Sequence, residues 1–571
     1  MKSWVPFLDW LPRYRRKDLS GDLPAGLTVG VLLIPQGMAY ATIAGLPVVY
    51  GLYAALVPQV VYALLGTSRQ LAVGPAAMDS LLVASGLAGM AVVGTDRYIE
   101  LALLLALMMG AIQLTLGVMR MGFLAQFLSR PVISGFTSAA AIIIGLNQLP
   151  SILGIEAERS AKLHVLAADA AGAVGETHLP TLMLSVAALA LLFVLRRWAP
   201  RIPGALAVVV LGILAVELGH LENVGIQVVG SIPAGLPGFH MPSLSVADLT
   251  ALGPMAATLA LIAFMEAYSV AKALSQKRGD HEVSANQELR ALGAANMLGA
   301  LFGAYPTTGG FSRSAVNDRA GARTGMSALI SAAVVALALT FLTPLFRALP
   351  AAVLGAIIVV AVSGLVDVRY PRHLWKSHRK EAVLLLATFV LTAFGGMVLG
   401  IASGLVLSLV LTIYRSTRPH AAELGTINGV FRNVDRFPAA ERMEGWLIVR
   451  YDGPLHYASQ AHFKEFLQHR LAERQAGGQP VHTVLLHAES IPYIDASAGA
   501  TLGHLLDDWQ QAGIGLKIAG AIGPVRDVLE RSGLMDRIGH DNFHTGIEAA
   551  LGMASEDAGH QRIATQTRVK R

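Results

Sequence analysis

Apolar residues fill the chain from about Leu23 to about Tyr414, and they gather into runs separated by short polar stretches. Many of these runs are roughly 17–25 residues long, which is the length that an α-helix needs to cross a bilayer. Leu179–Leu195, Pro203–Gly219 and Val383–Gly400 are examples. The pattern predicts about fourteen transmembrane helices, some of them short and interrupted by glycine or proline.

The pattern changes after about Ala421, where charged residues become frequent and no run is long enough to span a membrane. Strand-like runs such as Thr483–His487 alternate there with amphipathic helical stretches such as Ala498–Gln511, which predicts a small α/β domain. The predicted divisions are a cytoplasmic segment at 1–22, a transmembrane part at 23–415, a linker at 416–439, the α/β domain at 440–553 and a disordered tail at 554–571.

Composition agrees with a membrane protein, because 54% of the residues are hydrophobic, 14% are charged and the mean hydropathy is +0.55. The chain contains no cysteine, which excludes a disulfide framework and a cysteine-based metal site. Its net charge of +6 fits basic residues that flank membrane helices. We therefore expect membrane lipid, and no nucleic acid, among its partners.

Basic residues set the expected orientation. The run Arg13–Lys17 precedes the first apolar segment, and no cleavable signal is visible in Met1–Asp22. Arg415 and Arg418 follow the last apolar segment. Cytoplasmic loops of membrane proteins carry an excess of lysine and arginine, so both termini are expected to be cytoplasmic.

Two tracts are broken by glycine and proline at corresponding places in the two halves. Leu23–Tyr40 and Pro254–Ser269 are helical tracts that each hold a polar residue, and each is followed, after one further span, by a broken tract. The broken tracts are Val73–Ala77 and Tyr305–Ser314. Paired interrupted helices are typical of inverted-repeat transporters, in which they form a binding site near the middle of the membrane.

Half-helices that begin near Ala76 and Phe311 would each present an N-terminus carrying about half a positive charge. Arg313 would add a full positive charge, and the hydroxyls of Ser312 and Ser314 could donate hydrogen bonds. This set predicts an anion site. The alternative is that the small residues serve only close helix packing and that Arg313 extends to a membrane–water interface.

Three further polar residues lie in apolar tracts. Glu266 has no cation on its own helix face, so it could carry a proton in step with an anion, or it could be a permanently hydrogen-bonded contact between helices. Asp79 could be a second titrating site or a partner of a helix N-terminus. Gln36 could orient an anion or bond to a neighbouring helix.

Chemical motifs of enzymes are missing from the membrane part of the sequence. We find no nucleotide-binding P-loop, no histidines at metal-ligand spacing and no pair of nucleophile and base. The sequence therefore predicts a protein that is not an enzyme and that needs no cofactor or metal.

Four long stretches resemble the SulP family of anion transporters, which includes bacterial and plant sulfate permeases. They are IPQGMAYATIAGLPVVYGLYAALVP (34–58), LAVGPAAMDSLLV (71–83), FMEAYSVAK (264–272) and YPTTGGFSRSAVN (305–317). The tail resembles a STAS domain through YDGPLHYASQAHFKEFL (451–467), IPYIDASAGATL (491–502) and GPVRDVLERSGL (523–534).

This resemblance implies two inverted repeats of about seven helices each, arranged as a core and a gate, and a homodimer. It also implies one anion site between the N-termini of the third and tenth helices. The residues that would line the site are Gln36, Ala76, Ala77, Phe311, Ser312 and Arg313. Glu266 matches the acidic residue of the eighth helix that is associated with proton coupling in the plant permeases.

The sequence departs from the family pattern at two places. Asp495 is followed by Ala496 where STAS domains that act as phosphorylation switches have a serine, although Ser497 remains. Asp79 is an acid where the plant pattern has an apolar residue, which leaves the coupling stoichiometry open.

The leading hypothesis is a proton-coupled importer of sulfate in a bacterial cytoplasmic membrane, with a protein partner for the STAS domain. Bicarbonate and C4-dicarboxylates are alternative substrates, and sodium is an alternative coupling ion. A lone Glu266 without an additional cage of oxygen ligands favours H⁺ over Na⁺. The alternative outside transport is a membrane-anchored STAS signalling scaffold, which would not need buried charges.

Overall fold

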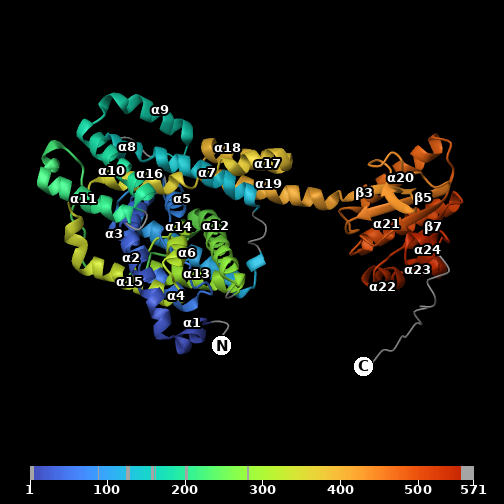
Figure 1. Cartoon of the computed structure of the whole chain (residues 1–571), viewed down its shortest axis with the longest axis horizontal. Helices are drawn as coiled ribbons and strands as arrows, with labels where there is room; N and C mark the ends of the chain where they lie inside the picture. The colour runs from blue at the N-terminus through green and yellow to red at the C-terminus, as the bar shows by residue number, and fades with distance from the viewer. Residues whose placement is uncertain are drawn as a thin grey trace. The chain divides into compact units, whose positions relative to one another are not determined.

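The computed structural model describes residues 5–87, 89–123, 129–155, 160, 162–199, 203–279 and 282–553. The chain forms two compact units, Met1–Ser408 and Leu409–Arg571 (Figure 1). The first unit is built from helices and two very short strands, and the second contains a six-stranded sheet. The predicted disordered tail, 554–571, lies outside the described residues.

Among the described residues, six helical segments are long and apolar enough to cross a membrane. They are α2 (Arg16–Ala44), α6 (Asp96–Val118), Arg130–Leu153, α10 (Leu179–Trp198), α12 (Val246–Arg278) and Met326–Phe346. Shorter apolar helical segments lie between and after them, at Val49–Leu65, Ala77–Leu87, Leu163–Ala173, Gly204–Gly219, Ala351–Ser363 and Ala402–Thr417. The predicted helical multi-pass architecture is confirmed, and the predicted number of helices stays a prediction.

A first helix group contains the two broken tracts. Several contacts that helices of one half make in this group are also made by the corresponding helices of the other half. The group contains α2, α4 (Val57–Leu65), α5 (Ala77–Leu87), α6, α12, α13 (Ala285–Ala300), α14 (Phe311–Arg319) and α15 (Met326–Leu337). α2 packs on α15 as α12 packs on α6, and α4 packs on α15 as α13 packs on α6. This pattern is what an inverted repeat produces when α2 corresponds to α12, α4 to α13 and α6 to α15.

A second helix group has its own internal contacts. It contains α7 (Arg130–Leu146), α10, α11 (Gly204–Gly219), α16 (Ala351–Ser363) and α18 (Arg379–Gly395), with α7 on α18 and α10 on α16. It meets the first group where α11 and α16 pack on α2 and where α7 packs on α5.

Close contact between helices in the first group depends on glycine. A Cβ atom at Gly110 of α6 would lie 2.7 Å from the carbonyl oxygen of Gly293 on α13. Lipid tails are as apolar as leucine, so helices in a bilayer associate through such close van der Waals contact rather than through the hydrophobic effect. Glycines outside the broken tracts therefore serve close helix packing.

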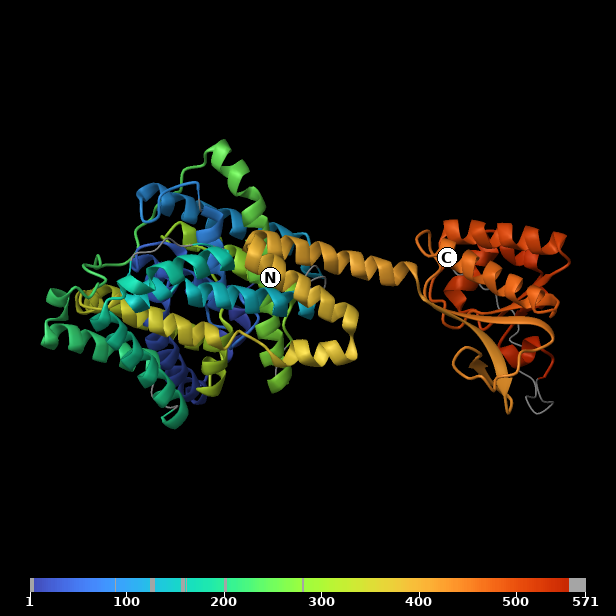
Figure 2. The same ribbon diagram turned by 90° about the horizontal axis from the view of Figure 1, so that it is seen from above.

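The second unit is a mixed sheet with strand order β4-β3-β5-β6-β7-β8. The strands are β3 (His420–Ile427), β4 (Val430–Asn433), β5 (Gly445–Asp452), β6 (Val481–His487), β7 (Gly515–Ala519) and β8 (Phe543–His544). β5 to β8 are parallel, and β3 is antiparallel to both β4 and β5. Figure 2 shows most of the helices of this unit gathered on one side of the β3–β4 ribbon.

Alternating apolar residues of β5, β6 and β7 form the core beneath these helices, as in Leu447 and Val449 of β5. The helices that cover this core are α20 (Gln460–Ala476), α21 (Ala496–Gln511), α22 (Gly523–Arg531) and α23 (Leu534–Ile538), and α24 (Ile547–Ala550) lies against the other face. The period of two along a strand sends successive side chains to opposite faces, which separates the two clusters.

The predicted linker at 416–439 is wrong, because β3 and β4 lie within it. Ile427 of β3 pairs with Val430 of β4, so the turn consists of Asn428 and Gly429 alone. Both residues have positive φ angles, 51° and 79°. Asn-Gly is the preferred pair for a two-residue hairpin turn, because that turn needs positive φ at both central positions. The Asn-Gly pair was present in the sequence, but the flanking strands contain polar residues and were not recognised as strands.

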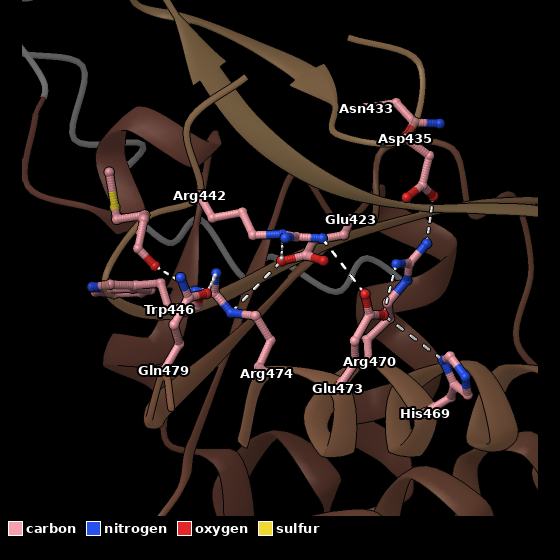
Figure 3. Close-up of polar contacts among 11 residues, drawn as sticks. Glu423, Asn433, Asp435, Arg442, Trp446, His469, Arg470, Glu473, Arg474 and Gln479 are labelled. Atoms are coloured by element: carbon pink, nitrogen blue, oxygen red, sulfur yellow. Dashed lines mark hydrogen bonds and ion pairs between the residues drawn. The ribbon is translucent and has the colours of Figure 1, made fainter. Parts of the chain in front are cut away.

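A buried ion-pair network joins β3 to α20 (Figure 3). Glu423 is only 1% exposed, and its Oε1 lies 3.3 Å from Nε of Arg442 and 3.8 Å from Nε of Arg474. Arg474 also donates from Nη2 to the carbonyl oxygens of Met443 (2.7 Å) and Trp446 (2.9 Å). The first strand, the segment before β5 and the helix are thereby held together.

The electrostatics of this network depend on pH. Burial raises the pKa of Glu423, although Arg442 and Arg474 oppose the change. The folded state then holds this proton more tightly than the unfolded chain does. The stability that this carboxyl contributes is therefore complete below its ordinary pKa, and it is lost as the pH rises through the raised value.

We expect Arg474→Met to lower the free energy of unfolding of the second unit by about 3 kcal/mol, because Glu423 would keep its charge with one buried partner fewer. Hydrogen exchange of the β3 and α20 amides in the whole protein measures this loss. Arg526→Met, at an exposed position, is the control. The double variant Glu423→Gln/Arg474→Met should regain the part of the protection that the unpaired carboxylate had cost, but not the part due to the lost bonds to Met443 and Trp446. An unchanged exchange rate in Arg474→Met would contradict the account.

Candidate functional site

The site lies where the two broken tracts meet. β1 (Val73–Gly74) and β2 (Thr308–Gly309) are antiparallel, with Val73 opposite Gly309 and Gly74 opposite Thr308. β1 is followed two residues later by α5, and β2 one residue later by α14, so both helix N-termini lie at this junction. The first N–H groups of a helix have no partner within it, which gives each N-terminus a partial positive charge. The predicted starts of the half-helices near Ala76 and Phe311 are confirmed.

Side-chain hydrogen bonds hold the junction in place. Ser314 Oγ accepts a hydrogen bond from the N–H of Ala72 (2.9 Å), which fastens α14 to the segment before β1. Thr308 Oγ1 donates to the carbonyl oxygen of Ala263 (2.6 Å), which fastens β2 to α12. The sequence predicted that the Ser314 hydroxyl donates to an anion, whereas in the structure it donates to the carbonyl oxygen of Gly310 (2.7 Å) and accepts from Ala72.

Asn296 is a positioning residue that the sequence did not reveal. Its Oδ1 accepts hydrogen bonds from the N–H (2.8 Å) and the hydroxyl (3.0 Å) of Thr307, and its Nδ2 donates to the carbonyl oxygen of the same residue (3.1 Å). A second amide, Gln113, lies 3.3 Å from Asn296 Nδ2 and donates to the carbonyl oxygen of Ala260 (3.1 Å). The signal in the sequence was a pair of amides inside apolar helices.

Arg313 is buried at the junction itself, with an exposed fraction of 2%. Its Nη1 donates to the carbonyl oxygen of Pro75 at 2.6 Å, so the guanidinium joins α14 to the start of α5. Its Nε and Nη2 are buried and have no hydrogen-bond partner among the described residues. The alternative in which Arg313 extends to a membrane–water interface is therefore wrong.

Two carboxylates come from other helices to the same junction. Asp79, in the first turn of α5, is 0% exposed, and both of its oxygens lack a hydrogen-bond partner in the described part of the chain. Glu266 of α12 is partly buried, and its Oε2 likewise has no such partner. Both carboxyls interact electrostatically with Arg313 and with each other. The cation that the helix face of Glu266 lacks is thus supplied by α14.

Two tyrosines complete the surroundings of Arg313, and sequence reasoning did not single them out. Tyr305 is fully buried, and its hydroxyl lies 3.0 Å from the hydroxyl of Ser80. Tyr40 is buried on α2, and both tyrosines interact electrostatically with Arg313. Tyr305 stands at the beginning of the broken tract, and Tyr40 stands one turn after Gln36, so position was the available signal.

The remaining predicted ligands surround the two helix starts. Ala76 and Ala77 are buried at the start of α5, whereas Phe311, with 63% of its surface exposed, and Ser312 are exposed at the start of α14. Gln36 is buried on α2, which packs against both α5 and α14, and its Oε1 has no hydrogen-bond partner among the described residues. The structure brings these residues together, and their roles as ligands stay predictions.

In the part of the chain that the structure describes, no group of three or more histidine, cysteine, aspartate or glutamate residues is arranged to hold a metal ion. In the second unit, Asp495 accepts hydrogen bonds from the N–H groups of Ala498 and Tyr457, both at 2.8 Å. It is therefore the N-cap of α21 and anchors the loop that follows β5. Ser497 is exposed in the first turn of this helix.

If the junction is an anion site, as the sequence predicts, Gly310→Ala should weaken anion binding about tenfold or more, with sulfate as the test anion. The new Cβ would lie 2.7 Å from Cζ of Arg313, so the guanidinium must move, and small misplacements of a charged group strongly affect its action. Calorimetric titration of the purified protein with sulfate measures the change. Gly253→Ala is the matched control, because a Cβ at that helical glycine would meet nothing within 4 Å. Equal affinity in both variants would show that the position of Arg313 does not matter.

Comparison with known proteins agrees with these features. Residues 19–388 match the model of the sulfate permease family, and residues 437–550 match that of the STAS domain. The chloroplastic sulfate transporter 4.1 of Arabidopsis thaliana is 37% identical over 570 residues, covering 96% of this chain and 83% of the relative. A probable sulfate transporter of Mycobacterium tuberculosis is 37% identical over 554 residues, covering 96% and 98%. The sodium-independent sulfate anion transporter of Bos taurus is 34% identical, covering 93% and 88%.

Solved structures share the fold. The murine Solute Carrier 26 family member A9 anion transporter in its inward-facing state has a TM-score of 0.88 at 25% identity, covering 96% of this chain and 93% of that one. The transmembrane domain of the cyanobacterial bicarbonate transporter BicA has a TM-score of 0.60 at 24% identity, covering 69% and 98%. The paired broken helices, the STAS sheet and these matches together show that the chain belongs to the sulfate permease family and carries a C-terminal STAS domain.

Proposed function

We propose that this chain is a secondary active transporter that imports sulfate together with protons. The observation that carries the proposal is the buried guanidinium of Arg313, which has two nitrogens without a hydrogen-bond partner among the described residues and lies at the meeting point of two helix N-termini. Such a place combines a full positive charge with two partial ones, and it favours a dianion. The relatives that are named as sulfate transporters support the choice of substrate.

The anion binds between the starts of α5 and α14. The ligands that we assign are Gln36, Ala76, Ala77, Phe311, Ser312 and Arg313. The alanines leave room for the anion to approach the backbone N–H groups of α5. Ser312 donates a hydrogen bond from its exposed hydroxyl, and Gln36 donates from its amide. Phe311 closes the open side of the site.

Glu266 couples the anion to a proton. A carboxyl beside Arg313 competes with the bound anion for the same positive charge, so protonation of Glu266 and binding of sulfate favour each other. Asp79 is assigned as a second titrating group of the same cluster. The bovine relative is named as sodium-independent, which supports H⁺ rather than Na⁺ as the coupling ion.

Transport proceeds by alternating access, in which the first helix group moves as a body against the second. The bonds from α12, α13 and α14 to the junction support this, because they tie the site to one group. We assign the protein to a bacterial cytoplasmic membrane as a homodimer, with both termini in the cytoplasm and the STAS domain available to a protein partner. Basic residues at both ends of the membrane part support this orientation.

Uptake into proteoliposomes tests substrate and coupling ion together. Labelled sulfate, bicarbonate and succinate are each supplied with an imposed proton gradient or an imposed sodium gradient. We expect sulfate to accumulate above its external concentration with the proton gradient alone. Accumulation of bicarbonate or succinate instead of sulfate would show that the substrate is wrongly assigned. Accumulation that depends on sodium would show that the coupling ion is Na⁺ rather than H⁺. The absence of transport in every arm would favour a STAS signalling scaffold.

A further inference from the structure

Asp79 is a buried acid that is not among the ligands assigned to the anion. It lies in the first turn of α5, yet its carboxylate accepts none of the hydrogen bonds that a capping residue would accept in the described structure. A permanently charged and unpartnered carboxylate in a fully buried position would be very costly. Since Asp79 is fully buried, its charge must be balanced by its neighbours or removed by a proton.

The groups that face Asp79 come from several elements. Three contacts define the junction around it: Ser80 to Tyr305, Arg313 to Pro75 and Thr308 to Ala263. The charged or titratable side chains there are Tyr40 from α2, Glu266 from α12, Tyr305 before β2 and Arg313 from α14. α6 and α7 also pack on α5, but Asp96 of α6 is exposed, and the other charged residues of these helices have partners: Arg97 pairs with Asp248, Glu100 with His240, and Arg130 stacks on Tyr370.

The charges of this cluster balance in two states. Without an anion, the single positive charge of Arg313 and the two helix N-termini, which add on the order of one further charge, offset two ionised carboxylates. With sulfate bound, the same positive groups offset the two negative charges of the anion only if both carboxyls are protonated. Net charge in a low-dielectric site is strongly penalised, so these two states are the ones suited to cross the membrane.

We infer that Asp79 and Glu266 each bind one proton when sulfate binds, so that the chain carries two protons with each sulfate and moves no net charge. Each proton binds to a carboxylate oxygen on the side of the membrane from which sulfate enters. It leaves the same oxygen on the side to which sulfate is released. Glu266 is partly exposed and Asp79 is not, so Asp79 exchanges its proton by way of Glu266. This inference rests on the proposed function, because it takes sulfate and protons as the transported species.

The sulfate gradient that a proton gradient can hold measures the stoichiometry. Whole protein is reconstituted into liposomes with the membrane potential held at zero by valinomycin and equal potassium, and the sulfate ratio at which net flux stops is determined for each imposed pH difference. Two protons per sulfate predict a ratio that rises about 100-fold per pH unit, and one proton predicts about tenfold. The wild-type ratio therefore decides the question even if a variant fails to transport.

Asp79→Asn should reduce the ratio to about tenfold per pH unit and make transport sensitive to voltage, whereas Asp79→Glu should keep about 100-fold and no voltage dependence. Size-exclusion chromatography and sulfate titration confirm that each variant is folded. A wild-type ratio of tenfold, or an unchanged ratio in Asp79→Asn, would overturn the inference and leave proton-coupled sulfate transport intact. A wild type that holds no sulfate gradient at all would instead overturn the proposed function.

Discussion

Glu266→Gln is expected to abolish the proton-driven accumulation of sulfate while sulfate binding changes by less than about tenfold. Glutamine keeps the size and a hydrogen-bonding group but cannot bind and release a proton. It also blocks the path by which the fully buried Asp79 exchanges its proton. Because the positive charge of Arg313 and both helix N-termini remain, the anion still has its site. Uptake into proteoliposomes measures accumulation, and calorimetric titration measures binding.

Glu222→Gln serves as the control, because Glu222 is an exposed glutamate outside the cluster. It should accumulate sulfate as the wild type does. If Glu266→Gln still concentrates sulfate with an unchanged pH dependence, then Glu266 has a structural role and coupling must be sought at Asp79 alone.

Arg313→Gln should weaken the binding of sulfate about 100-fold and that of bicarbonate about tenfold. Coulomb attraction scales with the charge of the ligand, so the dianion loses about twice as much binding free energy as the monoanion. Residual binding is expected because the two helix N-termini still provide about one positive charge together. Dissociation constants for both anions, measured by calorimetry on the same preparation, give the two losses.

Two further variants separate charge from structure at this position. Arg313→Lys keeps the charge but cannot reproduce the planar donor geometry of the guanidinium toward Pro75, so it should recover part of the sulfate affinity. Arg196→Gln removes an exposed arginine of α10 and should leave both affinities unchanged. Equal losses for sulfate and bicarbonate in folded Arg313→Gln would place this charge outside the field of the anion.

Local signals in the sequence were sufficient to predict the framework of the site. Glycine and proline break a helix at the position where they stand, so the starts of α5 and α14 could be placed to within a residue. Glu266, Asp79 and Arg313 could be identified because a charge in an apolar tract is costly and therefore informative. The symmetry of the two broken tracts predicted that α5 and α14 begin at one junction, whereas the arrival of Glu266 from α12 at the same junction was seen only in the structure.

Contacts between distant segments could not be predicted in the same way. Asn296 bonds to Gln113, and Tyr305 bonds to Ser80, only because the helices fold onto one another. A buried polar residue could bond to many different partners, and the residues next to it in the sequence do not indicate which partner it has. The wrong prediction of a linker at 416–439 has a different cause. The Asn-Gly turn was a local signal, and it was overlooked because the strands beside it contain polar residues.

Sulfate accumulation in sodium-free proteoliposomes tests the central claim most directly. The membrane potential is held at zero, and an inward proton gradient is the only driving force. The account predicts that labelled sulfate rises above its equilibrium level, and that this excess disappears when a protonophore removes the gradient. Sulfate that only equilibrates across the membrane, or that accumulates unchanged in the presence of the protonophore, would contradict the claim that this chain couples sulfate import to protons.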